Sequence, residues 1–160
     1  MTDPNSRRNF LRGRFSARRG PQRPPWALAE DAFLSACTRC GDCVRACPTQ
    51  IVVDRDAGYP TIDFGAGECT FCGDCAGACA TGALRRAAGQ PPWTIVASVG
   101  EDCLARQHVE CRVCGDLCDA RAIRFLPQLG GIAQPQIDAA ACTGCGACVA
   151  PCPTRALGVA

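Results

Sequence analysis

Four groups of four cysteines constrain the fold of this 160-residue chain more than any other feature. Three groups have the spacing C-x2-C-x2-C-x3-C, whereas the third group along the chain has C-x7-C-x2-C-x3-C. Quartets one to four consist of Cys37, Cys40, Cys43 and Cys47; Cys69, Cys72, Cys75 and Cys79; Cys103, Cys111, Cys114 and Cys118; and Cys142, Cys145, Cys148 and Cys152. A similar segment follows each quartet, which predicts a repeated unit in which a short turn leads into a strand.

The regular spacing predicts [4Fe–4S] clusters. Three cysteines separated by two residues each can surround one face of a cluster, and in bacterial two-cluster ferredoxins the fourth cysteine of one quartet binds the other cluster. Applied to this chain, the rule assigns four cysteines to each of four clusters. Cluster one takes Cys37, Cys40, Cys43 and Cys79; cluster two takes Cys69, Cys72, Cys75 and Cys47; cluster three takes Cys103, Cys111, Cys114 and Cys152; and cluster four takes Cys142, Cys145, Cys148 and Cys118.

Quartet three is the irregular group, because residues 104–110 lengthen its first gap. In the alternative interpretation Cys103 is a plain thiol, its site holds a three-iron cluster or none, and the chain binds three [4Fe–4S] clusters. A longer loop adds only modest closure entropy, and the other two spacings of the quartet are intact. We therefore expect Cys103 to be a ligand and the chain to bind four clusters.

Cysteine makes up 16 of 160 residues, a content typical of a disulfide scaffold or a metal protein. Disulfides and zinc sites are therefore the alternatives to iron–sulfur clusters. Structural zinc sites typically use two well-separated C-x2-C pairs rather than tight triplets with a remote fourth cysteine. Disulfides need an oxidising compartment, and the sequence shows neither a cleavable signal peptide nor an apolar run near the roughly 18 residues of a membrane span. We expect a cytoplasmic protein without a membrane span, whose thiolates bind iron.

The four quartets predict two tandem halves of the α+β class, each resembling a bacterial two-cluster ferredoxin with short hairpins and short helices. The predicted divisions are a basic tail at residues 1–27, a first half at 28–87, a Pro-rich linker at 88–92 and a second half at 93–160. Hairpins are expected between residues 51–53 and 60–64, and between residues 123–126 and 135–137. Domains below about 70 residues seldom fold by side-chain burial alone, so we expect each half to depend on its clusters.

The tail is strongly basic, with seven arginines and one aspartate in residues 1–25, and is expected to be a disordered arm. Its segment from Ser6 to Arg12 resembles the twin-arginine export consensus S-R-R-x-F-L-K, but a basic stretch follows where an export signal needs an apolar one. We interpret the arm as a recognition element for an acidic protein partner. Nucleic acid is disfavoured, because no basic patch with interleaved aromatic residues continues into the acidic body. The residues expected to contact the partner are Arg7, Arg8, Phe10, Leu11 and Arg12.

The sequence contains no recognisable catalytic constellation. Its single histidine, His108, lies in the long gap of quartet three without a nucleophilic partner, and neither a phosphate-binding loop nor a dinucleotide fingerprint is present. We expect no enzymatic activity and no cofactor beyond the clusters.

Several segments outside the cysteine spacing resemble the NapF family, ferredoxin-type accessory proteins of bacterial periplasmic nitrate reductase systems. They include residues 6–8, the Arg-Pro-Pro-Trp run at residues 23–26, the Gly-Tyr-Pro run at residues 58–60 and the long-gap segment at residues 103–112. The resemblance implies a cytoplasmic protein that binds the precursor of the molybdenum-containing catalytic subunit. It would assist maturation of that subunit before twin-arginine export, through cluster assembly, delivery or reductive protection. The alternatives are an electron-transfer relay, and a chaperone that uses its clusters as structural staples or as a redox sensor.

Overall fold

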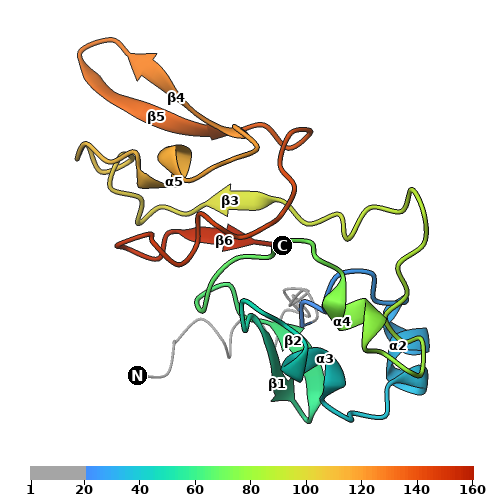
Figure 1. Ribbon diagram of the computed structural model, residues 1–160. Coiled ribbons are helices and arrows are strands. Elements are labelled where there is room, and N and C mark those ends of the chain that lie inside the picture. Colours follow the sequence, from blue (N-terminus) through green and yellow to red (C-terminus); the bar gives the residue numbers. More distant parts are fainter. Residues whose placement is uncertain (1–20) are drawn as a thin grey trace, which may run out of the picture.

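The computed structural model describes residues 21–160 as two halves joined by the segment between α4 and β3 (Figure 1). The first half contains α2 (Glu30–Ala36), α3 (Asp42–Arg45), β1 (Val52–Asp56), β2 (Tyr59–Ile62) and α4 (Asp74–Gly77). The second half contains β3 (Ala97–Val99), α5 (Val113–Asp116), β4 (Ile123–Gln128), β5 (Gly131–Ile137) and β6 (Leu157–Val159). The five tail residues predicted to contact a partner, Arg7, Arg8, Phe10, Leu11 and Arg12, lie outside the described residues.

Two hairpins occur where the sequence predicted them. β1 pairs antiparallel with β2, with Val52 opposite Ile62, and β4 pairs antiparallel with β5. The β1–β2 turn is formed by Ala57 and Gly58, which have φ values of 50° and 85°. Positive φ at both central residues is what a two-residue type I′ turn requires. Each hairpin returns the chain from one cysteine quartet to the next quartet of the same half (Figure 1).

A second kind of pairing, which the sequence analysis did not predict, closes each half on itself. β3 pairs antiparallel with β6, so that Ala97 lies opposite Val159 near the carboxyl terminus. The first half has a smaller counterpart, an antiparallel bridge between Ala27 and Leu84. In both halves the segment that precedes the first quartet therefore contacts the segment that follows the second quartet.

Each half has its own small core, and cysteine is a main component of both. In the first core Phe33 and Ile51, which are 0% and 1% exposed, pack with Cys43 and Cys75. The second core has no aromatic side chain among its buried members, which are Ala97, Cys103, Ala105, Cys114, Ile123, Cys148, Ala156 and Leu157. The second core is thus built largely from cysteine and alanine, whereas the first core combines two cysteines with bulky apolar side chains.

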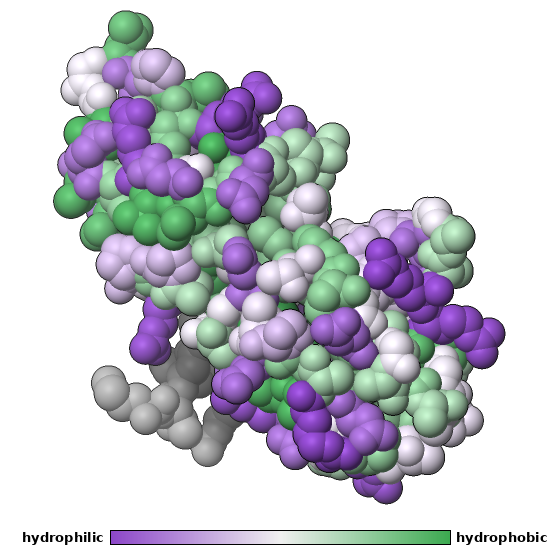
Figure 2. Space-filling model, viewed as in Figure 1, coloured by the Kyte–Doolittle hydropathy of each residue, from purple (hydrophilic) through white to green (hydrophobic). Residues whose placement is uncertain are grey.

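Apolar surface gathers on the second half, over the region of α5 and the β4–β5 hairpin (Figure 2). The large hydrophobic residues exposed in the described part of the chain are Val109, Val113, Leu117, Leu126 and Leu129. None of the helices described in residues 21–160 has the length and apolar character that crossing a membrane requires.

The folded first half begins earlier than the predicted boundary at residue 28. Residues 23–26 are buried, and the Trp26 amide donates a hydrogen bond of 2.7 Å to the Pro92 carbonyl oxygen. Arg23 is 7% exposed and is the one charged residue buried in the described part of the chain. Arg23 is the last arginine of the basic segment, so the sequence alone groups it with the tail, whereas its burial depends on residues distant from it.

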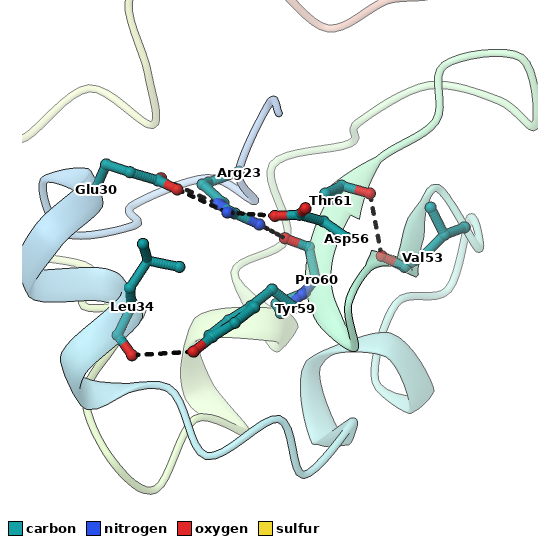
Figure 3. Close-up of polar contacts among 8 residues, drawn as sticks. All are labelled: Arg23, Glu30, Leu34, Val53, Asp56, Tyr59, Pro60 and Thr61. Atoms are coloured by element: carbon teal, nitrogen blue, oxygen red, sulfur yellow. Dashed lines mark hydrogen bonds and ion pairs between the residues drawn. The ribbon is translucent and has the colours of Figure 1, made fainter. Parts of the chain in front are cut away.

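Arg23 joins three elements of the first half (Figure 3). Its Nη2 lies 2.7 Å from Glu30 Oε1 in α2 and 2.7 Å from Asp56 Oδ2 in β1. Its Nη1 donates to the Pro60 carbonyl oxygen in β2 (3.3 Å), and the guanidinium lies 4.9 Å from the Phe33 ring centroid. The hydrogen bond from Arg23 lowers the pKa of Glu30. One buried cation thus fixes α2 against the β1–β2 hairpin.

Replacing Arg23 by Met should lower the free energy of unfolding by about 2 kcal/mol, because the apolar stem is kept while the charge-assisted hydrogen bonds are lost. The loss stays moderate because Glu30 and Asp56 are half exposed and can be hydrated. Denaturant unfolding of the cluster-loaded protein measures the change. Arg55→Met is the control, since Arg55 pairs with Asp63 on the surface and such pairs contribute little. Equal losses in the two variants would contradict a special role for Arg23.

Candidate metal centres

The loops of quartets one, two and four turn in the same way around their second cysteine. The residues immediately before and after that cysteine have positive φ in all three loops: Arg39 and Gly41, Phe71 and Gly73, and Gly144 and Gly146. Backbone that enters the left-handed region in this way can point successive N–H groups into a shared concavity, an arrangement found at many iron–sulfur sites. The three loops are therefore shaped to hold an anionic centre such as a cluster bound by thiolates.

The third cysteine of every quartet is buried: Cys43, Cys75, Cys114 and Cys148. The first three lie in α3, α4 and α5, and the fourth lies in a turn. Burial, together with the charges of neighbouring thiols, raises the pKa of Cys43 and Cys114 to about 11 and that of Cys75 and Cys148 to about 12. Thiolates in these positions need a nearby cation, which iron supplies when it replaces their protons.

The fourth cysteine of three quartets is paired with a threonine two residues later. The pairs are Cys47 with Thr49 (3.6 Å), Cys79 with Thr81 (3.6 Å) and Cys152 with Thr154 (3.8 Å). Burial acts to raise the pKa of these cysteines, but backbone amides and the threonine hydroxyl outweigh it, and the pKa is lowered. The sequence analysis missed these threonines, although the repeated C-x-T that ends three quartets was a visible signal.

Three small cavities each bring a cysteine triplet together with a remote fourth cysteine. One is lined by all four cysteines predicted for cluster one, including Cys79 from quartet two. The second is lined by the four predicted for cluster two, including Cys47, and the third by the four predicted for cluster four, including Cys118. The folded chain therefore places the fourth cysteine of one quartet beside the triplet of its paired quartet.

The long gap of quartet three folds into a packed turn. Ala105 is 0% exposed, and Gln134 Nε2 donates to its carbonyl oxygen (2.6 Å). Cys103 is buried, and its thiol and that of Cys111 lie close enough to Cys114 to help raise the pKa of Cys114. The turn thus returns Cys103 to the other two cysteines of its triplet, while Cys152, the remote cysteine predicted for this site, packs against the same core. His108, in the same turn, is exposed.

The residues around these centres fit a [4Fe–4S] cluster. Four thiols are the donor set of such a cluster. Backbone amides also donate to the sulfurs, as from Leu84 to Cys79 Sγ (3.4 Å) and from Ala122 to Cys118 Sγ (3.3 Å), and such hydrogen bonds tune a bound metal centre.

Comparisons with known proteins agree with this chemistry. Residues 36–84 and residues 109–156 each match a family described as a 4Fe-4S dicluster domain. The chain is 47% identical over 161 residues to the ferredoxin-type protein NapF of Haemophilus influenzae, covering 94% of this chain and 91% of that protein. It is 44% identical over 152 residues to the Escherichia coli K12 protein of the same name, with 95% and 92% covered. The methylamine utilization ferredoxin-type protein MauM of Methylorubrum extorquens is 37% identical, with 81% and 67% covered.

The first matched segment contains quartets one and two, and the second contains quartets three and four from Cys111 onward. Two tandem dicluster domains give four [4Fe–4S] clusters, which confirms the predicted number, and the matched segments contain every cysteine of the four quartets except Cys103.

Proposed function

The chain belongs to the family of ferredoxin-type proteins named NapF, and from this membership we propose that it is a cytoplasmic accessory protein without enzymatic activity. Its client is the precursor of the molybdenum-containing catalytic subunit of a periplasmic nitrate reductase. The protein binds this precursor and assists its maturation before twin-arginine export, by assembling, delivering or reductively protecting an iron–sulfur cluster.

The sixteen cysteines carry the chemistry of this proposal. Each cluster is held by a triplet and by the fourth cysteine of the paired quartet, as the three cavities support for clusters one, two and four. When bound, the clusters supply one-electron chemistry, and iron and sulfide for transfer. The predicted cluster ligands differ in how far they are exposed to solvent. Cys40 and Cys72, the second cysteines of quartets one and two, are exposed, whereas Cys103 is buried.

Similarity over 94% of the chain is the observation that carries the proposal. The exposed cysteines indicate where transfer would take place, because a client can approach a cluster whose edge is open to solvent. They favour the first half as the source of a transferred cluster. The apolar surface at residues 109–129 of the second half is suited to contact with a protein client, since exposed apolar patches mark interaction sites.

Transfer of labelled iron tests the proposal. The protein is loaded anaerobically with isotopically labelled iron, incubated with the cluster-free catalytic subunit and separated from it. We expect label and activity to appear in the catalytic subunit, and both to fall when Arg7 and Arg8 are replaced by Ala. Replacing Arg18 and Arg19 by Ala is the matched control, because it removes the same charge from another part of the tail. Label that stays entirely on this chain would rule out cluster delivery.

An electron-transfer relay is the second candidate function. The observation that favours it is a direct contact between the cysteine loops of the two halves, formed by the Cys69 amide and the Cys145 carbonyl oxygen at 2.8 Å. A relay passes electrons to its partner and keeps its iron, so the labelled-iron experiment separates the two functions.

A further inference from the structure

We propose that the two dicluster halves form one connected redox unit, joined loop to loop at quartets two and four, so that the cluster sites stand in series as one, two, four and three. The inference goes beyond the proposed function, because it concerns the chain alone and holds whether or not a client receives a cluster. It rests on the contacts between the two halves.

The central contact joins two predicted cluster ligands. The amide of Cys69, the first cysteine of quartet two, donates a hydrogen bond of 2.8 Å to the carbonyl oxygen of Cys145, the second cysteine of quartet four. Ligands of cluster two and cluster four are thus direct neighbours across the boundary between the halves.

Close packing around this hydrogen bond shows that the loops are fitted to each other. A Cβ atom on Gly146 would lie 1.9 Å from a ring carbon of Phe64, so the loop of quartet four has no room for a side chain there. Trp93 bridges the same boundary, because its Nε1–H donates to the Thr143 carbonyl oxygen (3.0 Å). Its ring packs edge-on against Phe64 and Phe71, with centroid distances of 5.9 and 5.8 Å. The aromatic side chains of the first half therefore rest on the cysteine loop of the second.

The order of the four sites follows from contacts within each half. In the first half, Cys47 lies with the quartet-two triplet and Cys79 with the quartet-one triplet, which ties sites one and two together. In the second half, Cys118 of quartet three lies with the quartet-four triplet, and Cys114 of quartet three packs in the same core as Cys148, which ties sites three and four together. Sites two and four are the pair in contact across the halves, so sites one and three are the two ends.

An electron placed on either half can then be shared with the other half through this contact. Clusters held by the cysteines of sites two and four would supply this one-electron chemistry: one would lose the electron that the other gains, with no proton and no further reactant. In the fully reduced protein the unpaired electrons of sites two and four should interact magnetically, and this interaction is measurable without any partner.

Electron paramagnetic resonance and hydrogen exchange on the intact, cluster-loaded protein test the inference. Gly146→Ala adds a methyl group that collides with Phe64, and the matched control Gly130→Ala adds the same group at a similar positive φ where nothing lies within 4 Å. Compared at equal iron content, Gly146→Ala should lose the line broadening caused by coupling between the halves and speed exchange of the Cys69 amide by about tenfold or more. Gly130→Ala should match the unaltered protein in both measurements.

Three outcomes would overturn the proposal. The first is rapid exchange of the Cys69 amide in the unaltered protein, which would mean that the contact does not exist. The second is an unchanged spectrum in a Gly146→Ala protein whose Cys69 amide exchanges faster, which would mean that the contact carries no coupling. The third is a Gly146→Ala protein that is unchanged in both measurements. Should Gly146→Ala fail to fold or lose iron, Trp93→Ala replaces it, because this substitution loosens the same boundary from outside the cysteine loops, and the same three outcomes decide the test.

Discussion

Removing iron and sulfide from the protein is expected to unfold both halves, with loss of near-ultraviolet circular dichroism and of nuclear magnetic resonance dispersion. Each half is below the size at which side-chain burial usually suffices, and cysteines are among the buried residues of both cores. The free energy of cluster binding is then largely folding free energy, as in other small metal domains. Without iron, buried thiols such as Cys75, whose pKa is raised to about 12, remain protonated and leave the core without its central group.

The measurement follows tertiary structure against iron content during anaerobic chelation, with reloading of iron and sulfide as the control for reversibility. The first half should keep slightly more residual structure, because Phe33 and Ile51 are fully buried and Arg23 joins α2 to the hairpin. A chain that keeps native dispersion after complete loss of iron would show that side-chain packing alone holds the fold.

The features that could be predicted from the sequence are those encoded over short distances. Cysteine spacing determines which sulfurs can surround one cluster, and turn residues such as Ala57 and Gly58 lie directly between the strands that they connect. The same local signals predicted the β4–β5 hairpin, which is observed. Repetition strengthened each prediction, since a pattern that occurs four times in one chain constrains all four copies.

The features that could not be predicted depend on residues far apart in the chain. β3 and β6 have three residues each, too few to show alternation, and their pairing joins the two ends of the second half. The contact between Cys69 and Cys145 and the burial of Arg23 by Glu30 and Asp56 are likewise set by tertiary packing. Local sequence patterns do not show which of these residues contact one another in the folded chain.

Quartet three lies between these two cases. Its intact second and third spacings predicted a cluster site, whereas the conformation of residues 104–110 could not be predicted. Arg112, which follows the second cysteine, has a φ of −129°, unlike its left-handed counterparts in the other quartets. The buried Ala105 and its hydrogen bond from Gln134 show how the longer loop is held instead.

The second large effect concerns iron content. It follows from the arrangement in which the fourth cysteine of one quartet lies at the cluster site of the other quartet in the same half. Replacing Cys79 by Ala is expected to remove the cluster of the quartet-one triplet, although Cys79 belongs to quartet two. Iron content should fall by about one quarter, because one [4Fe–4S] cluster of four loses a ligand. Cys47→Ala is the matched variant, and it should remove the cluster of the quartet-two triplet instead. Alanine is preferred to serine at both positions, since a serine oxygen could still bind iron.

Alkylation of the folded protein, followed by peptide mapping, identifies which thiols are released. For Cys79→Ala we expect the label on Cys37, Cys40 and Cys43. For Cys47→Ala we expect it on the quartet-two triplet, Cys69, Cys72 and Cys75. The physical reason is that each lining set contains the remote cysteine and not the fourth cysteine of its own quartet. Release of the quartet-two triplet by Cys79→Ala would instead mean that each quartet binds its own cluster, and the two sites of a half would then lack the shared ligands that tie them together.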